Sequence, residues 1–289
     1  EAEVAVLPRL YEATDQRDVT DTVRRAEARG LRTLVFSGHD LEPVMASGSV
    51  ILLHEGPTRG GQAHADVLAV PYVFTDRARW PEARADGSRP TVAFCGQGAS
   101  RMHVAPVSAV RRWFGLVADR SVRRVVAPPA GGHVRLRSAA LAALSLHPGI
   151  DDRFVVRDQY RAGVSSDADR ARTQAEFDDN LRSATYALCV RGTGNFSARF
   201  YESLSFGRVP LFVDTNCVLP FEDEIDWRSR TVWLDHTEVD SIGDRLMSAH
   251  PEVLVDPERS PDSLRRLWEE RLTEQGFYDH LPALVRRLL

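Results

Sequence analysis

The sequence predicts an α/β protein made of two Rossmann-like halves, each with its own parallel sheet. Short apolar runs of strand length alternate with amphipathic stretches along the 289 residues, a pattern typical of parallel sheets covered by helices. The segment Asp76–Pro90 is rich in Arg, Ala, Asp, Gly and Pro and has little apolar content. This composition predicts a linker. We therefore expect an N-terminal domain over residues 1–80 and a C-terminal domain over residues 89–289, with a cleft between them.

In the N-terminal half the expected elements are four strands and one helix. The helix is predicted at Val19–Arg29, and Gly30 follows it in the usual C-terminal position. The strands are predicted at Val4–Pro8, Thr33–Ser37, Val50–Glu55 and Val67–Phe74.

The C-terminal half repeats the alternation. Strands are predicted at Thr91–Gly96, Phe154–Asp158, Tyr186–Val190, Val209–Asp214 and Thr231–Asp235. Helices are predicted at Val107–Ala118, Ala168–Arg182 and Ser197–Phe206. A closing helix begins where Ser260 can cap it and Pro261 suits its first turn. That closing helix could pack back on the N-terminal domain.

Composition excludes several classes of protein. The net charge of -4 gives no overall basic field to hold a nucleic acid. No apolar run approaches the roughly 20 residues that a membrane span needs, and the chain does not open with a signal-peptide pattern. Because it starts at Glu1, an upstream segment could have been removed. The three cysteines are widely spaced, which argues against a disulfide scaffold. We expect a cytoplasmic protein, either free or peripheral to a membrane.

All 37 basic residues are arginine, so the chain has no lysine. This excludes the Walker A lysine, the kinase strand lysine and Schiff-base chemistry. A phosphate would have to be held by arginine, by backbone N–H groups or by a metal ion. We find no HExxH or CxxC motif, and we expect no metal site.

The stretch Val190–Ser203, "VRGTGNFSARFYES", has the features of a phosphate site at a strand end. Ligands of parallel sheets bind beyond the carboxyl ends of the strands. Gly192 and Gly194 form the turn, while Arg191 precedes it and Arg199 lies in the first turn of the helix. Asn195 or Ser197 can cap that helix, whose free N–H groups and positive dipole end suit a phosphate.

Glu202 lies three residues after Arg199, on the same face of the helix. Helical side chains lean toward the N-terminus, so this carboxylate could reach the two hydroxyls of a ribose above the helix start. The alternative is a plain Arg199–Glu202 salt bridge on a solvated face. A second, weaker turn at Gly96 and Gly98 is followed by Arg101, which could touch the diphosphate or the sugar.

The stretch from Leu181 to Trp227 resembles the core of the exostosin-type glycosyltransferases. That family has, in order, a Cys and a Gly at a strand end, then Ser, Arg, Glu, Gly, Pro and Asp, then LPF and a Trp. The matching residues are Ser183, Cys189, Arg191, Gly192, Ser197, Arg199, Glu202, Gly207, Pro210, Asp214, Leu219, Pro220, Phe221, Asp226 and Trp227.

The resemblance implies a GT-B fold, with two Rossmann-like domains facing a cleft. It also implies transfer from a nucleotide-sugar, usually a UDP-sugar, to an acceptor hydroxyl of a glycan or small molecule. The transfer would invert the anomeric carbon, and arginines would replace a metal ion, so no cofactor is expected. The general base would come from the first domain, where Asp40 ranks first and His39 and Glu55 follow.

Two other functions stay open. Asp214 ends the next strand, 20 residues after Gly194, where an NAD-binding fold places its ribose carboxylate. An NAD-dependent oxidoreductase is therefore one alternative, although the third glycine of its fingerprint is absent. A relative that binds sugar or nucleotide without transferring it is the other.

Overall fold

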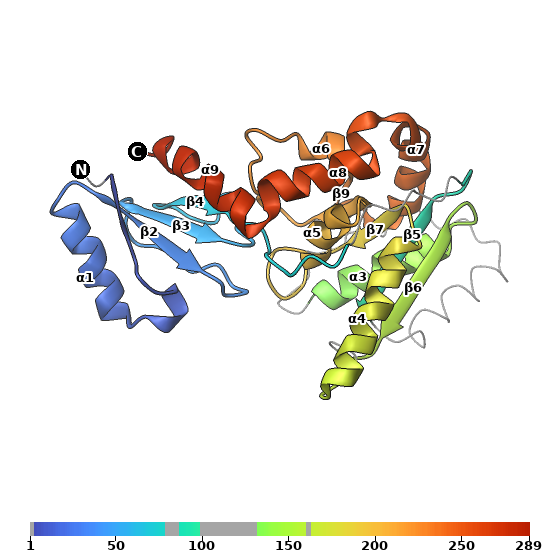
Figure 1. Cartoon of the computed structure of the whole chain (residues 1–289), viewed down its shortest axis with the longest axis horizontal. Coiled ribbons are helices and arrows are strands. Elements are labelled where there is room, and N and C mark those ends of the chain that lie inside the picture. The colour runs from blue at the N-terminus through green and yellow to red at the C-terminus, as the bar shows by residue number, and fades with distance from the viewer. Residues whose placement is uncertain (1–2, 79–86, 99–131, 160–162) are drawn as a thin grey trace, which may run out of the picture.

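The computed structural model describes residues 3–78, 87–98, 132–159 and 163–289. These residues form two separate parallel sheets of four and five strands, as the alternating pattern predicts (Figure 1). The four-stranded sheet contains β1 (Val4–Val6), β2 (Arg32–Ser37), β3 (Val50–His54) and β4 (Asp66–Ala69), paired in chain order.

One face of the first sheet is covered by α1 (Gln16–Glu27). Asp15 caps this helix by accepting a hydrogen bond from the N–H of Arg17, and Gly30 follows it with a φ of 70° that a residue with a side chain rarely adopts. The buried side chains of the helix pack against alternate positions of β2 and β3. They form a small core of Leu7, Val19, Val23, Val35, Met45, Val50 and Leu52.

The prediction that the fourth strand runs to Phe74 is wrong, because β4 ends at Ala69. The N–H of Val70 still donates to His54, but Pro71 has no N–H and cannot continue the ladder. The aromatic stretch that follows leads instead toward the second sheet, where the ring centroid of Phe74 lies 5.4 Å from that of Trp268.

The second sheet has the strand order β6-β5-β7-β8-β9 and is parallel throughout. Its strands are β5 (Thr91–Gln97), β6 (Asp151–Arg157), β7 (Tyr186–Cys189), β8 (Val209–Asp214) and β9 (Val232–Asp235). The sequence placed the start of β6 three residues late, at Phe154. β6 is an edge strand and therefore tolerates the polar residues Asp151 and Asp152 at its start. These two residues interrupt the apolar pattern, so the sequence alone does not indicate where the strand begins.

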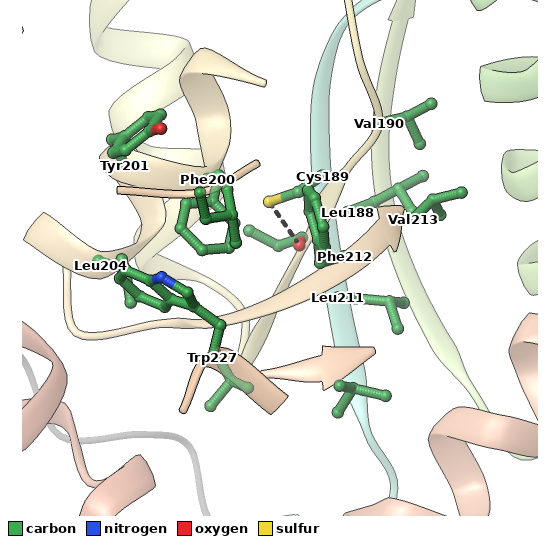
Figure 2. Close-up of a cluster of buried hydrophobic side chains, with 14 of the residues drawn as sticks. Leu188, Cys189, Val190, Phe200, Tyr201, Leu204, Leu211, Phe212, Val213 and Trp227 are labelled. Carbon is green, nitrogen blue, oxygen red and sulfur yellow. Dashed lines mark hydrogen bonds between the residues drawn. The ribbon is translucent and has the colours of Figure 1, made fainter. Parts of the chain in front are cut away.

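Helices pack around this sheet: α3 (His133–Ser145), α4 (Asp167–Arg182), α5 (Ala198–Ser205), α6 (Trp227–Arg230) and α7 (Ile242–Val255). Figure 2 shows Phe200 and Leu204 of α5 directed toward β7 and β8, with Trp227 beside them. The ring of Phe200 lies 5.2 Å from the rings of both Phe212 and Trp227. The sequence analysis missed α3 and α7, and its helix at Val107–Ala118 lies outside the described residues.

The closing segment consists of α8 (Pro261–Leu267), a π-helical turn (Trp268–Leu272) and α9 (Glu274–Arg286). The predicted cap is confirmed, since Ser260 accepts from the N–H of Ser263 and Pro261 begins α8. Figure 1 shows α9 beside the first sheet, and Arg32 donates to the carbonyl of Leu288 at 2.7 Å. Leu34, Ile51 and Leu53 of the first sheet share one buried cluster with Leu281 and Val285 of α9. Among the described residues, no helix has both the length and the apolar character of a membrane span.

Candidate active site

The order of the second sheet places a topological switch point between β5 and β7. The chain leaves β5 toward β6 on one side and later returns to β7 on the other side of β5. At such a point the two connections diverge and leave a crevice at the carboxyl ends of the strands, where open α/β sheets bind their ligands. Here those ends are Gln97, which lies between Gly96 and Gly98, and Cys189, which lies three residues before Gly192.

The turn after β7 is closed by a hydrogen bond from the N–H of Gly192 to the carbonyl of Phe196 at 3.0 Å. Arg191 lies over this turn, donating to the carbonyl of Thr193 at 2.9 Å and to Oδ1 of Asn195 at 3.3 Å. Gly194 is buried against the first sheet, where an added Cβ would lie 3.0 Å from the carbonyl oxygen of Asp40. A side chain at this position would therefore push the two parts of the site apart.

The prediction that Asn195 or Ser197 caps α5 with its side chain is wrong. Ser197 is the N-cap residue, yet its side chain makes no capping hydrogen bond to the described residues. Asn195 has a tertiary role: its amide donates to Thr58 at 3.1 Å, and its Oδ1 accepts from Thr215 at 2.7 Å. The first turn of α5 is thus left without a side-chain cap beside the arginines.

Arg199 lies across the ends of both central strands. Its guanidinium donates to the carbonyl of Cys95 at 2.6 Å and to that of Leu188 at 3.4 Å, and it lies 4.4 Å above the ring of Phe94. Gly96 makes room for it, because a Cβ there would lie 2.9 Å from Nη2 of Arg199. The Nε of Arg199 is buried and has no partner among the described residues.

Arg137 of α3 joins this group, although the sequence analysis did not select it. It donates to the carbonyl of Gln97 at 2.6 Å and to that of Arg191 at 2.9 Å, so it spans the switch point. No local motif marks this residue; only the packing of α3 brings it to the strand ends.

The cluster of Arg137, Arg191 and Arg199 has no carboxylate partner in the described part of the chain. Each guanidinium donates to carbonyl or amide oxygens, and none forms an ion pair there. Burial, with the charge of Arg199, lowers the pKa of Arg137 to about 10. Burial also lowers the pKa of Arg199 and, together with Arg137 and Arg191, that of His133. Burying cations without counter-charges costs free energy, so the binding of an anionic ligand would lower the cost of burying these three arginines.

Glu202 does not pair with Arg199. Its Oε1 accepts a hydrogen bond from Arg77 at 2.8 Å, and Arg77 also pairs with Asp178 at 3.0 Å. The alternative of a surface salt bridge between Arg199 and Glu202 is therefore wrong, because Arg199 is turned toward the strand ends and Arg77 of the linker pairs with Glu202.

The loops after β2 and β3 of the first sheet face the glycine turn. An added Cβ at Gly56 would lie 2.9 Å from the backbone of Asn195. Backbone pairing fixes this contact, since Thr58 bridges to Cys217 and the N–H of Val218 donates to Pro57 at 2.9 Å. The candidate residues Asp40 and Glu55 stand on these two loops, which the first sheet contributes to the site.

His54 holds the two loops together. Its Nε2 lies 2.9 Å from the carbonyl of His39, and its Nδ1 accepts from the N–H of Gly56 at 3.1 Å. His39 orders its own turn by accepting from the N–H of Leu41 at 3.0 Å. These contacts assign His39 a structural part in the loop that carries Asp40.

Glu55 has an unusual protonation equilibrium for a carboxyl group. Burial raises its pKa from 4.5 to about 7, and the nearby charge of Asp40 adds to the rise. A carboxyl group that titrates near neutrality can take a proton from a substrate hydroxyl, which an ordinary exposed carboxylate does less effectively.

Asp214 is a further candidate, at the end of β8. Asp214 accepts a hydrogen bond from the N–H of Cys217 at 3.0 Å, so one of its oxygens orders the turn after β8. Burial raises its pKa. Arg101 lies outside the described residues. Two hollows of about 430 and 420 Å³ lie elsewhere, along residues 268–280 and the 73–76 segment.

Comparison with known proteins identifies relatives of one kind. The model of the Exostosin GT47 domain matches residues 44–249. A probable beta-1,4-xylosyltransferase, IRX10L of Arabidopsis thaliana, is 29% identical over 115 residues, which cover 38% of this chain and 28% of that protein. The Exostosin-1 homolog of Caenorhabditis elegans is 33% identical over 104 residues, or 36% of this chain and 24% of the relative. The probable glucuronosyltransferase GUT1 of Oryza sativa subsp. japonica is 26% identical over 141 residues, which cover 47% of this chain and 34% of that protein. The match thus spans about a third or less of each relative's length.

Proposed function

Because the chain belongs to the exostosin GT47 family of glycosyltransferases, we propose that it transfers a sugar from a UDP-sugar to an acceptor hydroxyl. The transfer inverts the anomeric carbon and needs neither a metal ion nor another cofactor. The two parallel sheets are the halves of a GT-B fold, with the donor held by the second. Family membership argues against the NAD-dependent oxidoreductase alternative, and a transfer assay would distinguish the proposed enzyme from a relative that only binds.

The observation that carries this proposal is the cluster of Arg137, Arg191 and Arg199 at the switch point. Three cations without a carboxylate partner among the described residues suit a ligand with several negative charges. A diphosphate has this character, and guanidinium groups grip its oxygens in pairs. The glycine turn and the uncapped start of α5 add backbone N–H groups to the same place.

In the reaction, the acceptor oxygen forms a bond to the anomeric carbon while the bond from that carbon to the diphosphate oxygen breaks. The electron pair of the broken bond leaves with UDP. Negative charge therefore grows on the diphosphate in the transition state, and the fixed cations of Arg191 and Arg199 stabilise it. This is the reason for proposing transfer without a metal ion.

Glu55 accepts the proton of the acceptor hydroxyl in this mechanism. The sequence ranked Asp40 above it, but the raised pKa of Glu55 suits a general base near neutral pH. Asp40 contributes its charge to that shift. Glu202 accepts hydrogen bonds from the ribose hydroxyls of the donor.

A nucleotide panel in a thermal-shift assay tests the proposal. We expect UDP and UDP-sugars to raise the melting temperature, because they bind only the folded chain, whereas NAD leaves it unchanged. Stabilisation by NAD with no effect of UDP would contradict the donor assignment. Incubation of a stabilising UDP-sugar with candidate acceptors then asks whether UDP is released.

Chelation tests the role given to the arginines. Once a donor and an acceptor are found, we expect EDTA to leave the transfer rate within about twofold of its untreated value, because arginines neutralise the leaving group. Loss of activity in EDTA, with recovery on adding Mn²⁺ or Mg²⁺ but not Na⁺, would overturn the metal-independent mechanism.

A further inference from the structure

Arg77, in the linker between the two sheets, holds the carboxylate assigned to the ribose. Its Nη2 donates to Oε1 of Glu202 at 2.8 Å, and its Nε donates to Oδ1 of Asp178 at 3.0 Å. Asp178 is itself fixed by a hydrogen bond from Gln174 of the same helix, α4, at 3.0 Å. The linker, α4 and α5 thus meet at one guanidinium.

This ion-pair group is shielded from water. The exposed fractions of the side chains are 21% for Arg77, 11% for Asp178 and 15% for Glu202. The guanidinium carbon lies 5.5 Å from the ring of Phe74 and 5.9 Å from that of Phe177. Burial opposes the charged form of Arg77, yet the hydrogen bonds and charges of Glu202 and Asp178 raise its pKa overall. Shielded ion pairs of this kind are geometrically better defined than exposed ones.

The pairing uses only one oxygen of Glu202. Oε1 accepts from Arg77, whereas Oε2 has no donor among the residues that the structure describes. A carboxylate held in this way is fixed in direction, and it still has an acceptor for a hydroxyl group.

We propose that Arg77 is a positioning residue, which keeps the Glu202 carboxylate oriented for the donor's ribose hydroxyls. This inference rests on the proposed function, which gives Glu202 its ligand. It extends the donor site into the linker, 125 residues away in the chain. The competing explanation is that Arg77 only anchors the linker.

A double-mutant cycle on UDP affinity separates the two explanations. By isothermal titration, Arg77→Met is expected to weaken UDP binding about tenfold in the wild-type background and less than about twofold in Glu202→Gln, because the effect passes through that carboxylate. The matched control is Arg265→Met, which frees the same linker by removing the pairing with Asp76 at 2.9 Å, together with a hydrogen bond to the carbonyl of Ser205 in α5 at 2.8 Å, and does not touch Glu202. It should leave UDP affinity within about twofold of the wild type.

The outcomes distinguish this inference from the function on which it rests. If Glu202→Gln leaves UDP affinity unchanged, the ribose role of Glu202 fails and the inference fails with it. If Glu202→Gln weakens binding but Arg77→Met is additive with it, or Arg265→Met weakens binding equally, only the inference is overturned. Should Arg77→Met fail to fold, Asp178→Asn decides, because it loosens Arg77 without removing its bond to Glu202. A smaller loss of affinity that disappears in Glu202→Gln supports the inference, and an additive loss overturns it.

Discussion

Glu55→Gln is expected to abolish sugar transfer while making the folded protein more stable at about pH 8. The amide keeps the shape of the side chain but cannot accept the proton, and loss of a general base costs about 10²–10⁴-fold in rate. UDP affinity should stay unchanged, because the substitution removes no contact to the diphosphate.

The gain in stability follows from the sign of the pKa shift. The folded-state pKa of about 7 lies above the ordinary value of 4.5, so the folded chain binds the proton more tightly than the unfolded chain. The resulting stability is complete below about pH 4.5 and is lost as the pH rises through 7. At about pH 8 the wild type bears a cost of up to about 3 kcal/mol, which Gln avoids. Equal stability of the two proteins at about pH 4, and a more stable variant at about pH 8, can be measured by urea unfolding.

Asp40→Asn is the matched control. Because the charge of Asp40 adds to the raised pKa of Glu55, this variant should keep its activity and shift the acidic limb of the kcat/KM profile to lower pH. If Asp40→Asn abolishes transfer and Glu55→Gln does not, the base is Asp40, as the sequence ranked it.

Local pattern in the sequence was sufficient for the existence of the strands and for the glycine turn, although not for the bounds of β4 and β6. The turn at 192–196 depends on residues that are neighbours in the chain, and so does the Ser260 cap of α8. Asp40 and Glu55 were selected as candidates for a similar reason, since each follows an apolar run. Such features need no knowledge of distant contacts.

The remaining features depend on packing that leaves no local mark. The switch point exists because β7 pairs with β5 on the side opposite to β6, and the sequence does not state that order. Arg137 reaches Gln97 from α3, and Arg77 reaches Glu202 from the linker. The capping prediction failed in the same way, because Asn195 contacts Thr58 in the loop after β3 instead of its own helix.

Arg199→Ala is the second change with a large expected effect. If Arg199 stabilises the charge that grows on the leaving diphosphate, the rate of transfer should fall about a hundredfold, or roughly 3 kcal/mol. UDP affinity should fall as well. Some stability is lost too, by about 1–3 kcal/mol, because the carbonyls of Cys95 and Leu188 lose their donor.

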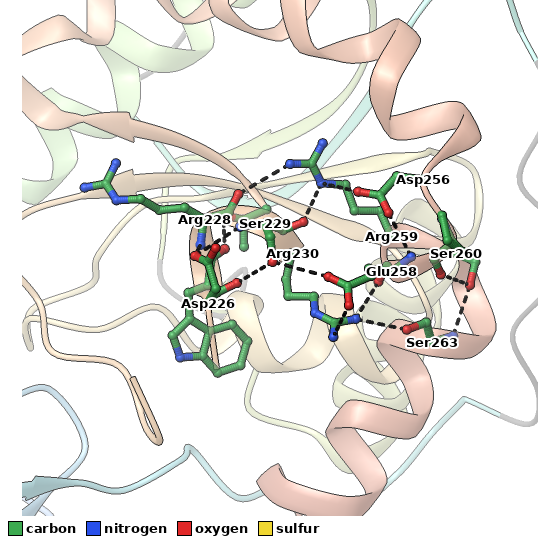
Figure 3. Close-up of polar contacts among 12 residues, drawn as sticks. Asp226, Arg228, Ser229, Arg230, Asp256, Glu258, Arg259, Ser260 and Ser263 are labelled. Atoms are coloured by element: carbon green, nitrogen blue, oxygen red, sulfur yellow. Dashed lines mark hydrogen bonds and ion pairs between the residues drawn. The ribbon is translucent and has the colours of Figure 1, made fainter. Parts of the chain in front are cut away.

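A second arginine provides a control for that structural loss. Arg228 also stacks on an aromatic ring, with its guanidinium carbon 4.6 Å from the ring centroid of Trp233, and it lies in the polar network around α6 (Figure 3). Arg228→Ala removes the same group from the same kind of contact away from the switch point, so it should leave UDP affinity and turnover unchanged.

Added guanidinium ion at millimolar concentration should restore part of the transfer rate in Arg199→Ala, because the cavity left at the strand ends can hold it. A dissociation constant for UDP within about twofold of the wild type in Arg199→Ala would show that the diphosphate lies elsewhere.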